Sequence, residues 1–262
     1  MNKSMDVADN TGDEAEENFL EMGLLEHLNE LRKRLTWAAG FLIVATLLSF
    51  AFAEPVLDFL LIPYANSAAE GAQLQTLRPT EGIETFFKVS LMMGAIVSMP
   101  FILWQFWLFI SPGLTKKERR YVYVFIPSAL LLFGTGVLFT WFILVPAAVS
   151  FLGNFLPDVF KTDWQGQEYI GFLMTMIFWV GVSFEMPVII YFVARVGVVT
   201  AQTLREQWRM AIVGIAVLAA AITPSIDPVT MLLTMSPLVV LYGMSIILAY
   251  IGQRQFEKSM AV

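Results

Sequence analysis

The chain has 262 residues, of which 57% are hydrophobic and only 15% are charged, and its formal net charge is −6. A soluble domain carries about 25% charged residues, so the composition excludes an ordinary soluble protein. The chain has no cysteine and a single histidine, His27, which excludes a disulfide framework and a thiolate metal site. We therefore predict no cofactor, no metal site and no metal-dependent chemistry.

The negative charge is concentrated near the N-terminus, where nine of the 22 acidic residues fall within the first 30 positions. Residues 1–18 contain almost no large apolar side chain, so they cannot bury enough surface to offset the entropy of ordering. The sequence predicts a disordered acidic tail over residues 1–20. We expect residues 21–252 to form a single transmembrane domain and residues 253–262 to form a short tail.

Six apolar segments follow, and a helix needs roughly 20 apolar residues to cross a bilayer core. They predict an all-α polytopic membrane protein with six transmembrane helices, at residues 36–53, 86–110, 121–145, 169–193, 209–223 and 229–251. The fifth segment covers only about 20 Å of a core about 30 Å thick, which predicts a short hairpin between the fifth and sixth helices. Proline predicts a loop over residues 54–84 and a second loop from Pro146 onward.

Lysine and arginine are distributed unevenly between the two predicted sides of the membrane. Thirteen of them lie on the side of the N-terminus and three on the other side. Because these residues are enriched in cytoplasmic loops, the six-helix plan predicts that both the N-terminus and the C-terminus are cytoplasmic.

The segment before the first span is amphipathic. Leucines at positions 24, 28, 31 and 35 share one helical face, while Glu26, Glu30 and Lys33 lie on the opposite face. This pattern predicts an interfacial helix that lies on the membrane and leads into the first span. Taken alone, Glu30 is most simply explained by an ion pair with Arg34, four residues later.

A second charged cluster, residues 115–120, follows the second span on the same predicted side. Thr115 and Glu118 have the spacing of a capping box at the start of the third helix, which is the simplest explanation of Glu118 taken alone. Phe109 ends an aromatic run that belongs either to an aromatic belt or to the lip of a peptide-binding surface. Because two carboxylates stand in basic surroundings on one side, we interpret them together as a surface that recognises a cationic polypeptide.

Two acidic residues in or beside the later spans carry further information. Glu185 lies midway in the fourth segment and is followed by Pro187. A charged carboxylate at that depth is costly against lipid, so we expect it to face protein, a water pocket or a partner helix, and we favour a functional role. Asp227, which precedes Pro228, is best explained as the cap of the last helix.

Together and in this order, these motifs resemble the TatC family, the multi-spanning receptor subunit of the twin-arginine protein translocase. The matching residues are His27-Leu28-x-Glu30-Leu31-Arg32-x-Arg34-Leu35, Pro63, Phe109-x-x-Pro112-Gly113-Leu114-x-x-x-Glu118-Arg119-Arg120, Phe184-Glu185-x-Pro187, and Thr223-Pro224 with Asp227. The resemblance covers about residues 20–252. Each motif is weak alone, whereas five in order on a six-span plan are specific.

The resemblance implies a protein of a bacterial or archaeal cytoplasmic membrane that exports folded proteins with the proton motive force. It implies a signal-peptide-binding surface made of Glu30, Arg32, Arg34, Phe109, Glu118, Arg119 and Arg120, in which the two glutamates bind the paired arginines. It also implies that Glu185 and Pro187 form an intramembrane site where single-span TatA- and TatB-type subunits dock, and that Pro63 and Asp227 are functional. Membrane lipid and further copies of the chain are the other expected partners, and nucleic acid is not expected.

Two other classes of function are weighed against this one. An ion-coupled multi-pass small-molecule transporter that uses Glu185 would need further buried polar groups along a path, and the sequence offers few. An intramembrane aspartyl protease needs two membrane aspartates, but Asp227 is the lone candidate, and a serine protease needs a base, but His27 lies before the first span. We therefore predict that the protein is not an enzyme.

Overall fold

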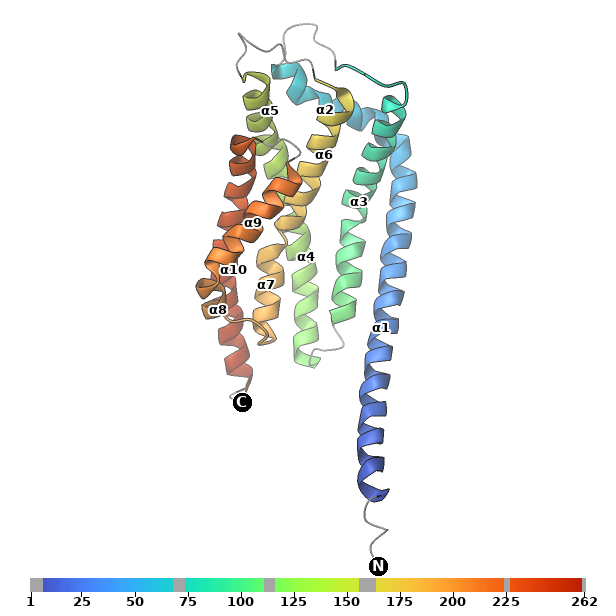
Figure 1. The fold of residues 1–262 in the computed structure, drawn as a ribbon, viewed down its shortest axis with the longest axis vertical. Coiled ribbons are helices and arrows are strands. Elements are labelled where there is room, and N and C mark those ends of the chain that lie inside the picture. The colour runs from blue at the N-terminus through green and yellow to red at the C-terminus, as the bar shows by residue number, and fades with distance from the viewer. Residues whose placement is uncertain (1–6, 68–73, 111–115, 156–163, 224–226, 261–262) are drawn as a thin grey trace, which may run out of the picture.

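The fold is described from a computed structural model, which covers residues 7–67, 74–110, 116–155, 164–223 and 227–260 (Figure 1). In these ranges the backbone alone is described for residues 7–24, 66–67, 110, 116–125 and 258–260. The α-helices are α1 (Val7–Ser49), α2 (Ala53–Ser67), α3 (Glu81–Ile110), α4 (Lys116–Phe139), α5 (Val145–Gly153), α6 (Gly166–Ser183), α7 (Met186–Arg195), α8 (Ala201–Glu206), α9 (Trp208–Ile222) and α10 (Pro228–Met260). A 3-10 turn, η1 (Phe50–Phe52), follows α1, and a π turn, η3 (Thr140–Leu144), follows α4.

Five stretches are long and apolar enough to cross a membrane, namely Leu25–Ala65, Glu81–Phe109, Ile126–Gly153, Gly166–Arg195 and Pro228–Glu257. The apolar helix α9 has 15 residues and therefore spans about 22 Å. Within the described ranges there is no β-strand, and one isolated bridge pairs Gln75 with Gln165. The predicted all-α polytopic fold is thus confirmed. The fifth helix is short, as predicted, but its partner α10 is a long helix of 33 residues.

Both chain termini lie at the same end of the helix bundle (Figure 1). We call this the terminal end, and it holds His27 of α1, the C-terminal end of α3 and the last turns of α10. The opposite end, which we call the distal end, holds residues 74–84 and 164–169. The first turns of α1 project beyond the other helices at the terminal end (Figure 1).

Helices α1 and α3 pack against each other in antiparallel orientation. Their contacts pair His27 with Phe109, Phe41 with Phe101, and Thr46 with Gly94, and Phe50 of η1, just after α1, contacts Phe86. A Cβ atom at Gly94 would collide with Thr46, so the glycine lets the two helices approach closely, as small residues do between membrane helices. This packing fixes which residues of α1 stand opposite which residues of α3 at the terminal end.

A second close packing brings α4 against α6. A Cβ atom at Gly136 would lie 2.8 Å from the ring of Phe184, and one at Gly181 would lie 3.0 Å from the ring of Phe133. Beside this contact, α6 ends at Ser183 and α7 begins at Met186. The predicted fourth span is therefore two helices separated by a turn at Phe184 and Glu185, and Glu185 lies inside the bundle.

Proline misled the loop predictions at two places. The sequence predicts a loop over residues 54–84, but Ala53–Ser67 is helical. Pro55 lies in the first turn of α2, where a missing N–H group costs no hydrogen bond. Likewise, the third span does not end before Pro146, because Pro146 lies in the first turn of α5. The preceding π turn shifts the hydrogen-bond pattern there, so the helical rod continues to Gly153.

The N-terminal region also differs from the expectation. Residues 24–35 are helical, but they continue directly into the first span as part of α1 and do not form a separate helix on the membrane surface. The helix extends back to Val7, into the segment for which the sequence predicts disorder. Extending an existing helix avoids the cost of nucleation, and the sequence from Glu14 to Leu35 contains strong helix formers with a single glycine and no proline.

Candidate functional site

Glu30 lies on α1 at the terminal end and is held by a residue of its own helix. Arg34 Nη2 donates to Glu30 Oε1 at 3.1 Å, and the two side chains are 29% and 25% exposed for Glu30 and Arg34. The ion pair predicted from the sequence is therefore present. The pair is half-buried, and ion pairs four residues apart on a helix are worth well under about 1 kcal/mol, so a competing guanidinium can displace Arg34 at little cost. Arg32, two residues before Arg34, is exposed.

An aromatic contact joins the segment of α1 that carries Glu30 to the end of α3. The ring of His27 stacks on the ring of Phe109, with centroids 4.4 Å apart and an angle of 24° between the planes. Because His27 lies one helical turn before Glu30, the stacked rings lie next to Glu30 along α1. His27 lies in the same motif as Glu30 but was not predicted as a site residue, because its contact with α3 depends on how the helices pack. The stacked rings of His27 and Phe109 connect the first two spans, and we call this aromatic surface the Phe109 lip.

The second predicted cluster is placed by its backbone only. Glu118, Arg119 and Arg120 lie in the first turns of α4, at the terminal end, and their side chains lie outside the described residues. Thr115, the predicted cap, also lies outside them. Close by in α3, Trp107 is buried and meets the ring of Phe192 edge to face at 4.5 Å. This contact fixes the C-terminal end of α3 against α7.

Glu185 is the acidic residue that lies deepest between the described spans. It is 2% exposed, and its Oε1 atom has no hydrogen-bond partner in the part of the chain that the structure describes. Its backbone carbonyl accepts from Val188 and Ile189, which start α7, and Pro187 lies buried in the first turn of that helix. A buried polar oxygen without a partner is costly, and one inside a membrane protein marks a site that another group can occupy.

Most of the other buried polar side chains are satisfied by nearby groups, whereas the buried Oγ1 atom of Thr230 has no hydrogen-bond partner among the described residues. Eight buried hydroxyl groups each donate to a carbonyl three or four residues earlier in their own helix: Ser49, Thr85, Ser90, Ser98, Thr140, Thr223, Thr234 and Ser245. Hydroxyls bonded in this way are satisfied without a solute. The described spans therefore give no support to the transporter hypothesis.

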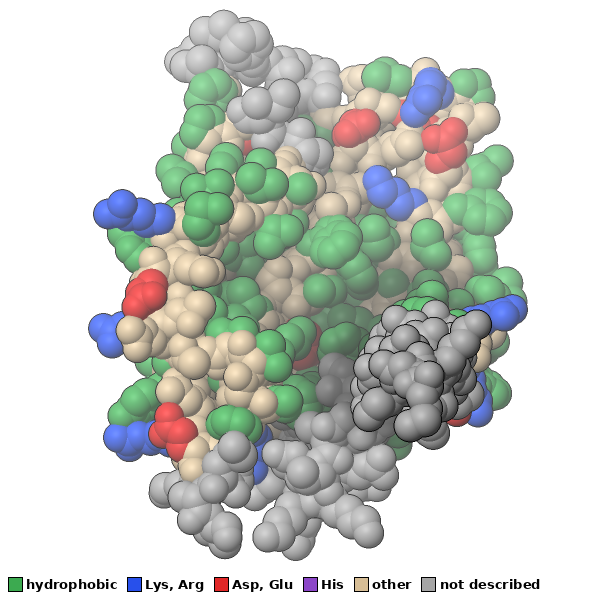
Figure 2. All heavy atoms as spheres, turned by 60° about the horizontal axis from the view of Figure 1, so that its bottom comes forward, with side chains coloured by type: hydrophobic (Ala, Val, Ile, Leu, Met, Phe, Trp, Pro, Cys, Tyr) green, Lys and Arg blue, Asp and Glu red, His purple; other side chains and the backbone are tan. Residues whose placement is uncertain are grey.

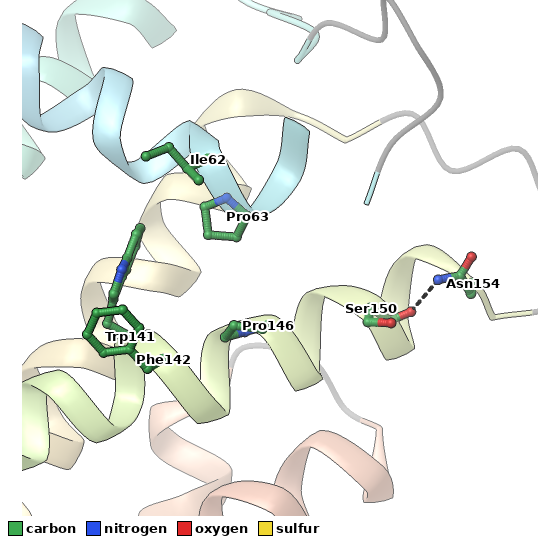
Figure 3. Close-up of a pocket in the computed structure, with 7 residues that line it drawn as sticks. All are labelled: Ile62, Pro63, Trp141, Phe142, Pro146, Ser150 and Asn154. Atoms are coloured by element: carbon green, nitrogen blue, oxygen red, sulfur yellow. Dashed lines mark hydrogen bonds between the residues drawn. The ribbon is translucent and has the colours of Figure 1, made fainter. Parts of the chain in front are cut away.

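Pro63 lies at the distal end beside a pocket. The pocket has a volume of about 540 Å³ and is lined by Ile62, Pro63, Trp141, Phe142, Pro146, Ser150 and Asn154 (Figure 3). Figure 3 shows that α2 forms one wall and the π turn with α5 forms the other. Phe59 of α2 stacks on Trp141 with centroids 4.1 Å apart. The π turn, which the sequence did not reveal, thus presents an aromatic surface to α2.

Asp227 caps α10, as the sequence predicted. Its Oδ1 atom accepts from the backbone N–H of Thr230 at 2.6 Å, and Pro228 is the first residue of the helix. This arrangement explains the residue through helix capping.

Figure 2 views the molecule with the terminal end turned forward, and it shows charged side chains at the rim and hydrophobic side chains across the middle.

In the described residues, five long apolar stretches and the shorter apolar helix α9 form a bundle, and this arrangement defines a multi-pass integral membrane protein. Residues 26–237 match the family model described as Sec-independent protein translocase protein (TatC). The chain belongs to the TatC family. It is therefore a component of a protein translocase, as the motifs of the sequence predicted.

Individual relatives agree with the family match. The chain is 38% identical to the Sec-independent protein translocase protein TatC of Helicobacter pylori over 228 residues, which cover 86% of this chain and 87% of the relative. It is 36% identical to the protein of the same name from Deinococcus radiodurans, with 86% and 85% covered. A crystal structure described as the twin arginine translocase receptor TatC superposes with a TM-score of 0.80 at 35% identity, covering 87% of this chain and all of the other.

Proposed function

We propose that this protein is the core receptor of a twin-arginine translocase and binds twin-arginine signal peptides at its terminal end. The observation that carries the proposal is the Glu30 carboxylate, held by an intrahelical ion pair beside the stacked His27 and Phe109. Glu118 with Arg119 and Arg120 completes the surface from the start of α4. The likeness to a crystal structure of a twin arginine translocase receptor supports the same role.

The chemistry suits arginine better than lysine. A guanidinium group presents a planar fork of donors that a carboxylate accepts at two points, which an ammonium group cannot reproduce. In the free protein the Arg34 guanidinium is paired with the Glu30 carboxylate. An arginine of the incoming peptide replaces Arg34 in this ion pair. The exchange replaces one guanidinium by another, so the selectivity lies in the fork geometry, and the apolar part of the peptide packs on the Phe109 lip.

The proposed function also involves the orientation of the protein in the membrane and its partner subunits. Terminal-end recognition requires that both termini face the cytoplasm, in a bacterial or archaeal cytoplasmic membrane, and the excess of lysine and arginine at that end supports this orientation. Glu185, whose buried Oε1 atom has no partner among the described residues, receives a polar group from the single helix of a TatA- or TatB-type subunit, with Pro187 beside it. Self-association of the chain completes the assembly. The proton motive force drives the export of folded proteins.

The test is a titration of the full-length protein, in detergent micelles, with a fluorescent peptide that carries adjacent arginines. Glu30→Gln keeps the size of the side chain but removes the charge that attracts the guanidinium, so we expect about tenfold weaker binding, on the order of one charge-assisted hydrogen bond. The matched control is Glu26→Gln, which removes the same charge from an exposed position one turn away and should change affinity by less than about twofold.

A peptide with paired lysines serves as the second control and should bind the wild type about tenfold more weakly. If Glu26→Gln and Glu30→Gln weaken binding equally, the interaction is only a general attraction between charges. Equal affinity for the arginine and lysine peptides would refute the receptor proposal.

A further inference from the structure

At the terminal end, α1 and α3 each carry a buried polar atom that has no hydrogen-bond partner among the described residues, and the chemistry of these two atoms is complementary. Nε of Arg34 is a donor, Oε1 of Gln105 is an acceptor, and neither has a hydrogen-bond partner among the described residues. Each such group costs free energy when it is buried alone. Arg34 already holds Glu30 through Nη2, so the unpartnered donor belongs to the residue that a signal-peptide arginine must displace.

The packing of α1 on α3 places these two residues level with each other. Arg34 is seven residues from His27 and seven from Phe41, while Gln105 is four residues from Phe109 and four from Phe101. His27 stacks on Phe109, and Phe41 stacks on Phe101. Steps of seven and of four return a residue to the same face of a helix. Arg34 and Gln105 therefore both face the α1–α3 interface, midway between the two stacked pairs.

From this arrangement we propose that Gln105 is the acceptor that receives Arg34 when a signal-peptide arginine takes Glu30. This inference rests on the proposed function and adds a residue to it. Without an acceptor, the displaced Arg34 would remain next to two guanidinium groups of the peptide, with a buried donor unsatisfied. Gln105 removes that penalty, because the Arg34 guanidinium turns from α1 toward α3 and bonds its amide oxygen.

The neutral amide suits this role better than a carboxylate would. A glutamate at position 105 would form an ion pair with Arg34 in the free protein. Glu30 would then lose its ion-pair partner Arg34. A leucine or methionine there would give Arg34 no acceptor, so Arg34 would compete with the peptide for Glu30. Gln105 is thus a positioning residue that acts on the peptide through Arg34, and two opposite changes at this position have opposite expected effects.

The test uses the full-length protein and the fluorescent twin-arginine peptide. Gln105→Met keeps the length and the unbranched shape of the side chain but removes the acceptor, and we expect about tenfold weaker binding. Gln105→Glu should bind the arginine peptide a few times more tightly than the wild type. The control for added charge is Asn29→Glu, at an exposed position of α1, which should raise affinity for arginine and lysine peptides alike.

The decisive comparison repeats Gln105→Met in an Arg34→Ala background. If Gln105 acts only through Arg34, the methionine variant has no further effect once Arg34 is absent. An equal loss of affinity in both backgrounds would mean that Gln105 contacts the peptide or supports the fold, and would overturn the proposal, as would an unchanged affinity of Gln105→Met in the wild-type background. Failure of the receptor proposal itself looks different, because then Glu30→Gln leaves binding intact.

Discussion

The two ends of the bundle hold their carboxylates in different ways. At the distal end Glu81 is 2% exposed and accepts from the backbone N–H groups of Leu77 and Arg78, at 2.6 and 3.4 Å, and from the side chain of Gln165, 84 residues away. At the terminal end the described partner of Glu30 is Arg34, one turn away on the same helix. One carboxylate ties distant parts of the chain together, and the other stays exchangeable.

Further bonds extend the distal arrangement. The backbone of Gln75 accepts from Gly166 and donates to Trp164, each at 2.9 Å, and Gln167 joins Arg78 and Glu84 through its side chain. These bonds connect the segment before α3 to the start of α6 across the end of the bundle. The distal end is therefore a fixed cap, whereas the described contacts of Glu30 at the terminal end are local ones that a ligand can replace.

The largest expected effect is in cysteine labelling, which reports the side of the membrane that each end of the bundle faces. The natural chain has no cysteine, so single cysteines report their own accessibility. Cysteines at Asn29 and Gln202, both exposed at the terminal end, should react with an impermeant maleimide only in inverted vesicles. A cysteine at Thr76, exposed at the distal end, should react only in intact cells. Labelling of Asn29 in intact cells would reverse the proposed orientation.

The second prediction tests whether the distal cap is structural. Glu81→Ala leaves two backbone N–H groups and the Gln165 amide without their acceptor, and it should lower the free energy of unfolding by about 3 kcal/mol, because each buried unsatisfied group costs roughly 1–3 kcal/mol. Thermal unfolding in detergent measures the loss. The control is Glu84→Ala, an exposed carboxylate of the same cap, which should shift the midpoint much less. Similar shifts in both variants would show that burial of Glu81 contributes nothing.

Glu185 lies between the two ends, and its substitution should affect assembly alone. Glu185→Ala removes the polar group proposed to receive the partner helix, so co-purification of TatA- and TatB-type subunits should fall about tenfold, the size of one buried hydrogen bond to a charged or polar group. Glu185→Gln keeps hydrogen-bonding capacity and should retain most of the assembly. Peptide binding at the terminal end should stay unchanged in both. If Gln is as inactive as Ala while the subunits still co-purify, Glu185 couples protons and does not dock a partner.

The smallest expected effect belongs to Glu118. Glutamine also completes a capping box, so Glu118→Gln separates capping from recognition. We expect about fivefold weaker binding of the twin-arginine peptide, less than for Glu30→Gln, because Arg119 and Arg120 beside Glu118 already offset part of its charge. Thermal stability should not change. A silent substitution would assign Glu118 to capping alone and leave the recognition surface to Glu30.

Local rules made part of this structure predictable from the sequence. Apolar runs gave the spans, the four-residue spacing of Glu30 and Arg34 gave their ion pair, and the order Asp227-Pro228 gave the cap of α10. Each of these features depends on residues within one or two helical turns. The family motifs added the expectation of a translocase component, which the family match confirms.

Features that depend on contacts between distant segments were not predictable. The distal cap joins Glu81 to Gln165, and glutamine or glutamate beside a span carries no signal of its partner. Gln105 lay within an aromatic run and became informative only when the packing of α3 on α1 set it opposite Arg34. Helix α2 was missed because Pro55 and Pro63 indicate a loop, whereas Pro55 lies in the first turn of the helix and Pro63 lies inside it.

The short helix α9 has a consequence for the lipid around the protein. Trp208 and Arg209 begin the helix at the terminal end, and its outward residues Met210, Val213 and Val217 are exposed. Figure 1 shows α9 and the start of α10 ending short of the distal ends of α3 and α5. Because a helix of about 22 Å is shorter than a hydrocarbon layer of about 30 Å, we expect the layer beside α9 to thin locally, at a cost of fractions of a kcal/mol per Å. Such thinning would place elastic strain in the lipid along this flank and shorten the apolar barrier there.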